Sequence, residues 1–536
     1  GVPPTYNWNE PSFGGFGSLQ VDNSKPEFSC FIELTDFLEQ NHLPFPKHIY
    51  FPFPTDVVFA YRTNPRILQD CVIETDLHLP FGFDADSPDL EQSYLLILIS
   101  LPLKIRRVAY CEVLHESLHE SSAPFTKKLS SAHFYTTCRL DTIFEDDRYQ
   151  NLVNLNLTFQ ISHEVTKLIP RSVKTLNCNI LCPEFQVDDF GFPSGLKSLN
   201  VLLFNYPEQC WACFNDLEHL SNLLFENIKN EKRVPYYNVR FPKSLKSVKS
   251  TGLDVEAIKN QCPNLTSFEC SIARHAERHG NSFNFPEKLT NLRVGGGTLA
   301  NIEKYENGSS IKFPKSLQAL HLVRDSQNVQ FGESETLFSN KEESMLQNLK
   351  ILSINYFDGF SRLGPLPQSL TQLTINLPSQ RMEMLNSDFF DNLKSVTSLQ
   401  LLRIYCPLGA NFDYELPPKL QLLEFINPEL SKISLRSKSL KQLNLYQTKF
   451  SVVSPENFQV PDSLVELKLH GPSFLSDEGG IQSFAKSSVF PQKLQRLELG
   501  CDAMHKIPIL PPNLKTLDIT CQVARAKQYD FDNLPT

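Results

Sequence analysis

Residues His115–His119, HESLH, match the HExxH pattern of zinc proteases. In that pattern the two histidines share one face of a helix and bind zinc, and the glutamate between them activates a water molecule. The surrounding sequence lacks the rest of such a site. Glu120, Ser121 and Ser122 follow directly, no G-x-x-H continuation appears, and no second acidic helix stands out to supply a third ligand. A zinc metalloprotease is therefore the least favoured functional alternative, behind the two binding functions given below.

The cysteines could form a different metal site. Cys210 and Cys213 make a CxxC pair, which Cys178 and Cys182 could complete to four ligands. Cys178 also occupies the last apolar position of a repeat unit, where a free cysteine is an ordinary core residue. Gly295–Gly297 lacks the context of a phosphate-binding loop, and no Ser/His/Asp set emerges. The sequence thus predicts no catalytic residue, no metal, no cofactor and no enzymatic activity.

One pattern recurs along the chain, (F/L/I/V)-P-x-x-L-x-x-L-x-(L/V/I). Clear copies are FPSGLKSLNV from Phe192, FPKSLQALHL from Phe313 and FPQKLQRLEL from Phe490. The first Leu of LxxLxL serves as an anchor, and proline stands three residues before it in 11 of 18 copies. Successive anchors lie 20 to 32 residues apart: Ile105, Leu129, Leu152, Val173, Leu196, Leu220, Leu245, Leu265, Leu289, Leu317, Leu349, Leu370, Leu399, Leu420, Leu440, Leu464, Leu494 and Leu514.

The physics of the pattern predicts a stack of strands. The x-L-x-L part has strand period, so its leucines face one way and its x residues face the other. One such strand cannot bury its apolar face alone, whereas stacked copies share a continuous core and form a parallel sheet. The proline ends the preceding segment at a point where its missing N–H costs no ladder hydrogen bond.

The stretch LPLKIRRVAY, Leu101–Tyr110, has two interpretations. As the start of an F-box, a module that docks onto a ubiquitin-ligase adaptor, it would have to lead into a long helix. As a repeat unit it is a strand, with Ile105, Val108 and Tyr110 in register. The next anchor, Leu129, follows 24 residues later, which favours the strand.

These motifs resemble leucine-rich repeats, L-x-x-L-x-L with a period of 20 to 29 residues. The P-x-S-(L/V)-x-x-L form, as in IPRSVKTL from Ile169, is similar to the FNIP-type repeats of amoebal and some fungal proteins, although no Phe-Asn-Gln follows the strand. The regular Asn of common leucine-rich repeats is also missing. The loops after each strand must therefore satisfy their backbone groups in another way.

The resemblance implies an α/β fold, a leucine-rich-repeat solenoid shaped as a horseshoe or superhelix. We expect a long concave parallel sheet and mostly irregular convex segments, with short helices only in longer repeats, such as Ser379–Ser398 and Ser334–Gln347. The predicted organisation is an irregular leader at 1–24, an atypical N-terminal cap or degenerate repeats at 25–100, a solenoid of about 18 repeats at 101–525, and a C-terminal tail at 526–536.

Composition narrows the function classes. The net charge of −9 argues against a nucleic-acid partner, which a basic excess would favour. The longest apolar run, Leu95–Leu101, is far shorter than the roughly 18 residues of a membrane span. The 13 cysteines show no disulfide-framework spacing, so we expect a reducing location, cytoplasmic or nuclear, and no membrane partner.

The x positions of LxxLxL should form the concave surface. Arginine and tyrosine are the usual anchors of protein interfaces, so Arg403, Tyr405 and Tyr446 are the leading predicted contacts, together with Arg293 and His321. The predicted function is a non-catalytic protein–protein interaction scaffold that binds protein partners on this face. The alternative implied by the resemblance is the substrate receptor of an SCF-type ubiquitin ligase, similar to F-box proteins with leucine-rich repeats, with the ligase adaptor as a further partner.

Overall fold

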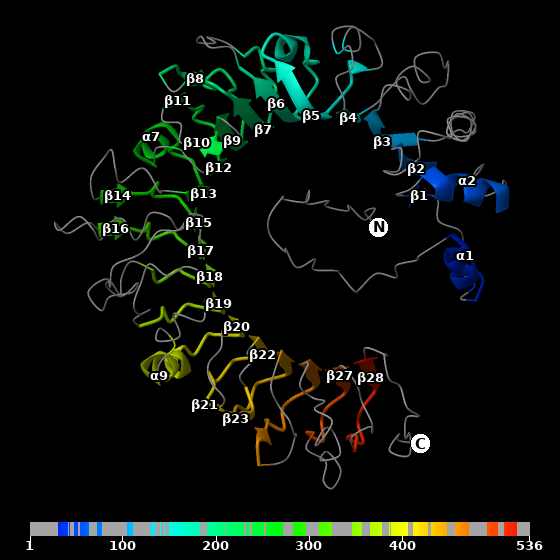
Figure 1. Cartoon of the computed structure of the whole chain (residues 1–536), viewed down its shortest axis with the longest axis vertical. Coiled ribbons are helices and arrows are strands. Elements are labelled where there is room, and N and C mark those ends of the chain that lie inside the picture. Colours follow the sequence, from blue (N-terminus) through cyan, green and yellow to red (C-terminus); the bar gives the residue numbers. More distant parts are fainter. Residues whose placement is uncertain are drawn as a thin grey trace. The chain divides into compact units, whose positions relative to one another are not determined.

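Figure 1 shows the computed structural model of the whole chain. It divides into two compact units, Gly1–Leu129 and Ser130–Thr536. The structure describes residues 31–40, 42, 48–51, 54–63, 72–77, 104–110, 130–134, 140, 144, 149–182, 190–207, 209–229, 232–234, 238–250, 253, 255–271, 282–295, 310–323, 346–355, 365–377, 385, 387–405, 411–426, 430–447, 456–470, 490–501 and 509–521.

The described residues of the first unit form parallel strands and two helices. The elements are α1 (Phe31–Gln40), β1 (His48–Phe51), α2 (Pro54–Thr63), β2 (Val72–Leu77) and β3 (Lys104–Tyr110). β1 pairs with β2 and β2 with β3, both in parallel. The strand predicted at Ile105–Tyr110 is confirmed by β3, so these residues do not form the helix that an F-box would need. The HESLH motif, 115–119, lies outside the described residues.

The second unit is a parallel β-solenoid, in which each strand of one long sheet pairs with the next in chain order. Its strands are β4 (Ser131–Phe134), β5 (Asn154–Ser162), β6 (Thr175–Leu181), β7 (Ser198–Phe204), β9 (Asn222–Lys229), β12 (Ser247–Ser250), β13 (Ser267–Ser271), β15 (Asn291–Gly295), β17 (Ala319–Val323), β18 (Ile351–Asn355), β19 (Gln372–Asn376), β20 (Leu401–Tyr405), β22 (Leu422–Ile426), β24 (Gln442–Tyr446), β26 (Glu466–His470), β27 (Arg496–Cys501) and β28 (Thr516–Cys521). The predicted repeat architecture and long parallel sheet are thus confirmed.

The core follows the predicted alternation. In β17, Leu320 and Leu322 are fully buried, while Ala319, His321 and Val323 are half-exposed on the other face. The anchors just before the strands, such as Leu317 and Leu420, are also 0% exposed. Each repeat therefore contributes an anchor and two strand side chains to one continuous core, which stabilises a stack that no single strand could sustain.

The proline of each repeat begins a turn that delivers the anchor to the core. In the Pro314 copy, the N–H of Leu317 donates to the proline carbonyl over 3.1 Å, and the same bond recurs from Leu196 to Pro193 and from Leu494 to Pro491. Copies without proline keep the turn, as when Leu349 N–H donates to the carbonyl of Leu346 over 3.0 Å. Proline therefore favours this turn by fixing φ but is not required for it.

A ladder of serine hydroxyls replaces the missing Asn ladder. The serine one residue before the anchor donates to the carbonyl of the preceding anchor: Ser244 to Leu220, Ser316 to Leu289, Ser369 to Leu349, Ser398 to Leu370, Ser439 to Leu420 and Ser463 to Leu440, over 2.6 to 2.8 Å. Asparagine at the same position, as in Asn348 and Asn513, donates to the carbonyl two residues before the preceding anchor. Ser172 is an exception, because its buried hydroxyl has no hydrogen-bond partner. The P-x-S-L form thus satisfies backbone carbonyls between repeats.

The Ser316→Ala substitution tests this ladder. Ser316 donates to the carbonyls of Glu287 and Leu289 over 2.6 and 2.7 Å, so we expect the free energy of unfolding to fall by about 1 kcal/mol. Denaturant titration followed by circular dichroism measures the loss. Ser194→Ala is the matched control, because Ser194 is exposed in an equivalent turn. An equal change in both variants would contradict a structural role for the ladder.

The opposite side of the solenoid is more regular than expected. It carries the short parallel pairs β8 (Ala212–Cys213) with β11 (Val239–Arg240) and β14 (Ser282–Asn284) with β16 (Ser310–Lys312). A second small sheet joins β21 (Asn411–Glu415), β23 (Lys432–Arg436) and β25 (Phe458–Gln459). These stretches are exceptions to the expected irregular segments, because alternating sequences such as NFDYE also stack on their counterparts in the next repeat. β10 (Lys232–Val234) pairs antiparallel with β9, and η3 (Val165–Leu168) is a short 3-10 turn.

The helices also depart from the prediction. α9 (Ser387–Ser395) lies inside the predicted Ser379–Ser398 segment, which confirms that expectation, whereas residues 334–345 of the other candidate lie outside the described residues. α7 (Val255–Gln261) occupies the 20-residue interval between anchors Leu245 and Leu265. The rule that only long repeats carry helices was thus wrong, because two buried side chains, Val255 and Ile258, suffice to seat one turn against the core.

The described solenoid contains few helices, so its character is mainly β. The domain limits predicted at residues 24, 100 and 525 stay predictions. Among the described residues no helix has the length and apolarity needed to cross a membrane.

Candidate recognition surface

A single row of side chains runs across the long sheet, on the face opposite the core. We call this the polar face. The strand register places the following residues side by side at the middle of successive strands: Lys249, Glu269, Arg293, His321, Ser353, Thr374, Arg403, Glu424, Asn444, Lys468, Glu498 and Asp518. Neighbouring positions lie roughly 4.8 Å apart, so opposite charges on adjacent strands can pair directly.

Glu424 on β22 is the centre of one such group. Its Oε2 lies 3.5 Å from Arg403 Nε on β20 and accepts a 3.4 Å hydrogen bond from Asn444 Nδ2 on β24. Its Oε1 accepts a hydrogen bond from the Tyr405 hydroxyl. The Glu424 side chain is only 16% exposed, so three strands hold their polar side chains around one largely buried residue.

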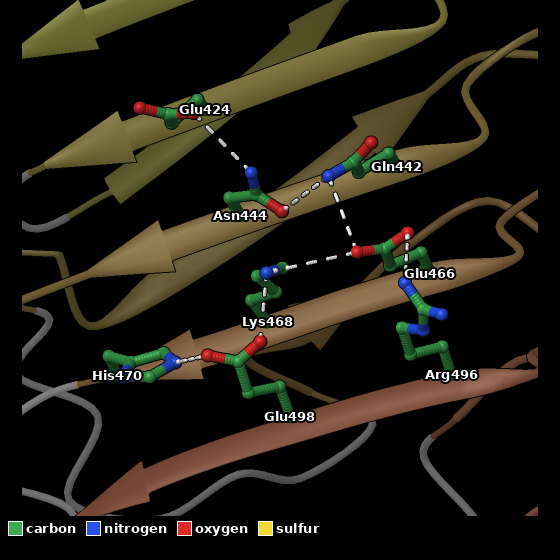
Figure 2. A network of polar contacts seen from close by, with 8 residues as sticks. All are labelled: Glu424, Gln442, Asn444, Glu466, Lys468, His470, Arg496 and Glu498. Carbon is green, nitrogen blue, oxygen red and sulfur yellow. Dashed lines mark hydrogen bonds and ion pairs between the residues drawn. The ribbon is translucent and has the colours of Figure 1, made fainter. Parts of the chain in front are cut away.

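The same pattern continues toward β27 (Figure 2). Gln442 Nε2 donates to Asn444 Oδ1 and to Glu466 Oε1 over 3.3 and 3.4 Å. Lys468 Nζ lies 3.9 Å from Glu466 Oε1 and 2.8 Å from Glu498 Oε2. Arg496 Nη1 lies 3.9 Å from Glu466 Oε2. We call the whole set the Glu424–Glu498 network: Arg403, Tyr405, Glu424, Gln442, Asn444, Tyr446, Glu466, Lys468, His470, Arg496 and Glu498.

An imidazole and a phenol form one end of this network. His470 Nε2 lies 2.7 Å from Glu498 Oε1, and the His470 ring lies 5.2 Å from the Tyr446 ring. Gly500 stands opposite His470 in the register, and a Cβ added at Gly500 would lie 2.1 Å from His470 Nδ1. The absence of a side chain at Gly500 therefore leaves room for the imidazole beside Glu498.

Burial and the contacts within the network shift the pKa values of Tyr405, Tyr446 and Glu498. Burial raises the pKa of Tyr405, and its hydrogen bond to Glu424 raises it further. Burial and the charge of Glu424 also raise the pKa of Tyr446. Burial alone would raise the pKa of Glu498, but hydrogen bonds from Lys468 and His470 outweigh it and lower that pKa. The network therefore keeps Tyr405 and Tyr446 neutral and Glu498 ionised near neutral pH.

A smaller group, the Glu269 cluster, comprises Lys249, Glu269, Arg293 and His321. Glu269 Oε1 lies 3.2 Å from Lys249 Nζ and 3.4 Å from Arg293 Nε. Burial and the adjacent Arg293 charge lower the pKa of His321. Ser353 and Thr374, on β18 and β19, separate this cluster from the Glu424–Glu498 network in the row.

The five predicted contact residues fall into these two groups. The structure gathers Arg403, Tyr405 and Tyr446 near Glu424, and Arg293 and His321 beside Glu269. The prediction did not single out Glu424, which pairs with Arg403 and Tyr405, or Glu498, which pairs with Lys468 and His470. The sequence did contain a signal for these pairs. At the fourth position after the anchor, adjacent repeats carry opposite charges: Arg403 is followed by Glu424, and Lys468 by Glu498.

Three of the four cysteines of the possible metal set are core residues, and the fourth, Cys213, is partly exposed. Cys178 is 0% exposed, and Cys182 and Cys210 are buried, all as free thiols. Burial raises the pKa of Cys178 and raises that of Cys182 to about 12, so neither thiol forms a thiolate near neutral pH. The core interpretation of Cys178 is confirmed. Within the described part of the chain no group of three or more His, Cys, Asp or Glu side chains is arranged to hold a metal ion.

Neither a protein-family model nor a curated protein matches this sequence.

Proposed function

We propose that this chain is a non-catalytic recognition protein that binds a protein partner on the polar face of its long sheet, centred on β20–β27. The observation that carries the proposal is the Glu424–Glu498 network, in which side chains from successive strands hold one another in fixed positions. We also propose that the chain is a leucine-rich-repeat protein of the FNIP type, because its repeated motif resembles that family.

Preorganisation supports a binding role. Ordering a flexible side chain on binding costs about 0.5–1.5 kcal/mol. Arg403 is held by Glu424, Tyr405 donates to the same carboxylate, and the Tyr446 ring lies against His470. A partner therefore meets arginine and tyrosine side chains that have already lost much of this freedom, and these residue types dominate protein interfaces.

The charge balance of the network indicates the class of partner. The network contains equal numbers of cationic and anionic side chains: Arg403, Lys468 and Arg496 against Glu424, Glu466 and Glu498. Because these groups form ion pairs with one another, the electrostatic field of the surface is weak. A polyanion such as nucleic acid gains little from a surface whose cations are already paired with carboxylates. A folded protein surface with both donors and acceptors fits better.

The proposal predicts a specific loss of binding. With the full chain as bait in affinity purification and mass spectrometry, we expect a reproducible set of captured proteins. The triple variant Arg403→Ala, Tyr405→Ala, Tyr446→Ala should reduce capture at least about tenfold, because each truncation removes an anchor. Quantitative mass spectrometry of the eluates measures the effect.

The matched control is Asn291→Ala, Gln372→Ala, Thr516→Ala, three exposed positions on the polar face of other strands. It should capture the same proteins as the unaltered chain. Equal capture by the anchor variant would refute the proposed surface. A ubiquitin-ligase adaptor among the captured proteins would favour the substrate-receptor alternative over a plain scaffold.

A further inference from the structure

The turns that precede the strands of the long sheet are strongly basic. Three positions flank each anchor there: two residues before it, one residue before it and one residue after it. In the 16 described turns, from Leu152 to Leu514, these positions hold three carboxylates and 13 cations: Arg171, Lys174, Lys197, Lys243, Lys246, Lys288, Lys315, Lys350, Lys419, Lys438, Lys441, Lys493 and Lys515. We call these 13 cations the basic turn edge. The turns therefore carry a net charge of +10, in a chain whose total is −9.

The parallel register brings these turns to one edge of the sheet. The residue after each anchor donates its N–H to the carbonyl of the residue after the preceding anchor, as Lys197 does to Lys174 over 2.8 Å. The same bond joins Lys246 to Ser221 and, at the far end, continues the row to Lys515. Neighbouring turns thus lie roughly 4.8 Å apart, and the cations of successive repeats form one file.

The cations of the basic turn edge are not neutralised by the solenoid. Within the part of the chain that the structure describes, none of the 13 forms an ion pair. Twelve are exposed, and Lys174 is half-exposed. This differs from the Glu424–Glu498 network, where Arg403, Lys468 and Arg496 lie beside carboxylates. The basic turn edge therefore directs its positive potential outward, where it attracts an anionic partner.

The charge is densest at the turns before β6 and β7. Arg171 and Lys174 lie in one turn and Lys197 in the next. Gly195 leaves room for the Lys174 side chain, since a Cβ added at Gly195 would lie 2.3 Å from Lys174 Nζ. The amine of Lys174 therefore lies over the turn that carries Lys197. Like charges held this close repel one another, and carboxylates supplied from outside would relieve that repulsion.

The residue types of the turns argue against nucleic acid and lipid. Proteins bind single-stranded nucleic acid by adding aromatic stacking to the cations, and they bind membrane surfaces by adding apolar side chains. The 16 described turns hold no aromatic residue at these positions, and apart from prolines their apolar side chains are Val153 and Val465. Arginine, which holds phosphate with two parallel hydrogen bonds, occurs once among the 13 cations.

The three carboxylates of the turns also indicate the class of partner. Glu218, Glu287 and Asp462 are exposed and interrupt the file of cations. A uniformly negative partner, such as a phosphodiester chain or an anionic bilayer, would be repelled at each of them. A polypeptide can place a neutral or basic residue at these points and acidic residues at the others.

We propose that the basic turn edge binds an acidic polypeptide segment of a partner protein. The segment lies across successive repeats and pairs its Asp and Glu side chains with the exposed lysines. Its strongest contacts are with Arg171, Lys174 and Lys197, where the positive charge is densest. The surface goes beyond the proposed function, since it shares no residue with the Glu424–Glu498 network.

Binding of three defined probes to the full chain tests the proposal. The first is a labelled peptide of about 20 residues that alternates Glu and Ser, which in extended form presents every carboxylate on one face and spans roughly 65 Å. The others are a single-stranded oligothymidine of the same length and vesicles that contain phosphatidylserine. We expect the peptide to bind more tightly than both, with an affinity that falls as salt is raised, because exposed charges make the contacts.

A charge-reversal variant locates the binding. Lys174→Glu, Lys197→Glu should weaken peptide binding at least about tenfold, because each change removes an attraction and adds a repulsion. The matched control is Lys259→Glu, Lys432→Glu, which changes the net charge equally at positions away from the turns. It should bind the peptide as the unaltered chain does. All four lysine side chains reach solvent, so both variants keep the fold, as circular dichroism verifies.

The outcomes separate the possible partners. Absence of peptide binding, binding that survives Lys174→Glu, Lys197→Glu, or an equal loss in the control overturns the proposal. Tighter binding of oligothymidine or of the vesicles, lost in the same variant, also overturns it by assigning the edge to nucleic acid or to lipid. The variant Arg403→Ala, Tyr405→Ala, Tyr446→Ala should bind the peptide normally, so none of these results bears on partner capture by the Glu424–Glu498 network.

Discussion

The substitution Phe412→Ala should lower the free energy of unfolding by about 4 kcal/mol, the largest effect expected from a single change. Phe412 on β21 is 1% exposed. Its ring lies 4.6 Å from the Phe425 ring on β22 and 5.3 Å from the Phe390 ring on α9. The side chain thus joins the second small sheet, a helix and the long sheet, and its removal leaves a cavity that all three border.

In a solenoid this loss should be local before it is global, because each repeat contacts mainly its neighbours. Hydrogen exchange followed by mass spectrometry should show faster exchange in α9 and β22 than in β6 or β7. Denaturant titration gives the total loss. Asp413→Ala is the matched control, since its 3.5 Å ion pair with Arg436 is exposed and contributes little. Unchanged exchange in α9 and β22 would contradict the role assigned to Phe412.

The second large effect is expected at Glu424. Replacing it with Ala removes the acceptor for Tyr405 and Asn444 and the partner of Arg403. We expect the free energy of unfolding to fall by about 2 kcal/mol, since half-buried donors are left without an acceptor. Arg403 and Tyr405 should also become mobile, so capture of the partner should fall toward the level of the triple variant. Thermal unfolding and the same affinity purification measure the two consequences.

Glu424→Gln separates charge from packing. The pKa of Tyr405 is raised first by burial and then by Glu424, so in this variant it should fall toward its ordinary value of about 10 but stay above it. Tyrosinate absorbance, taken as the difference from a matching Tyr405→Phe protein, measures the change. If Tyr405 had the same pKa in the Glu424→Gln variant and in the unaltered chain, the contribution assigned to Glu424 would be contradicted.

The same raised pKa sets a pH dependence. A hydroxyl whose folded pKa lies above its unfolded value stabilises the fold fully below about pH 10, and this contribution is lost as the pH rises through the folded pKa. We therefore expect the unaltered chain to lose stability above about pH 10 more steeply than its Tyr405→Phe variant.

The sequence by itself determined the repeat, its strands and its core. Leu320 and Leu322 are buried because their spacing matches the strand period, a property written within a few consecutive residues. The same local pattern placed Arg403, Tyr405 and Tyr446 on the polar face, and the P-x-x-L motif marked the turn before each anchor.

Only the tertiary structure decided which side chains meet between repeats. Ser316 donates to a carbonyl 27 residues earlier, and Tyr405 to a carboxylate 19 residues later. Those separations vary because the connecting segments vary from repeat to repeat, so neighbours across strands follow no fixed sequence spacing. The long β6, β7 and β9, the helix α7 and the second small sheet arise in the same way. Each of these elements depends on the strands and apolar surfaces of the adjacent repeat, which cannot be read from the sequence of one repeat alone.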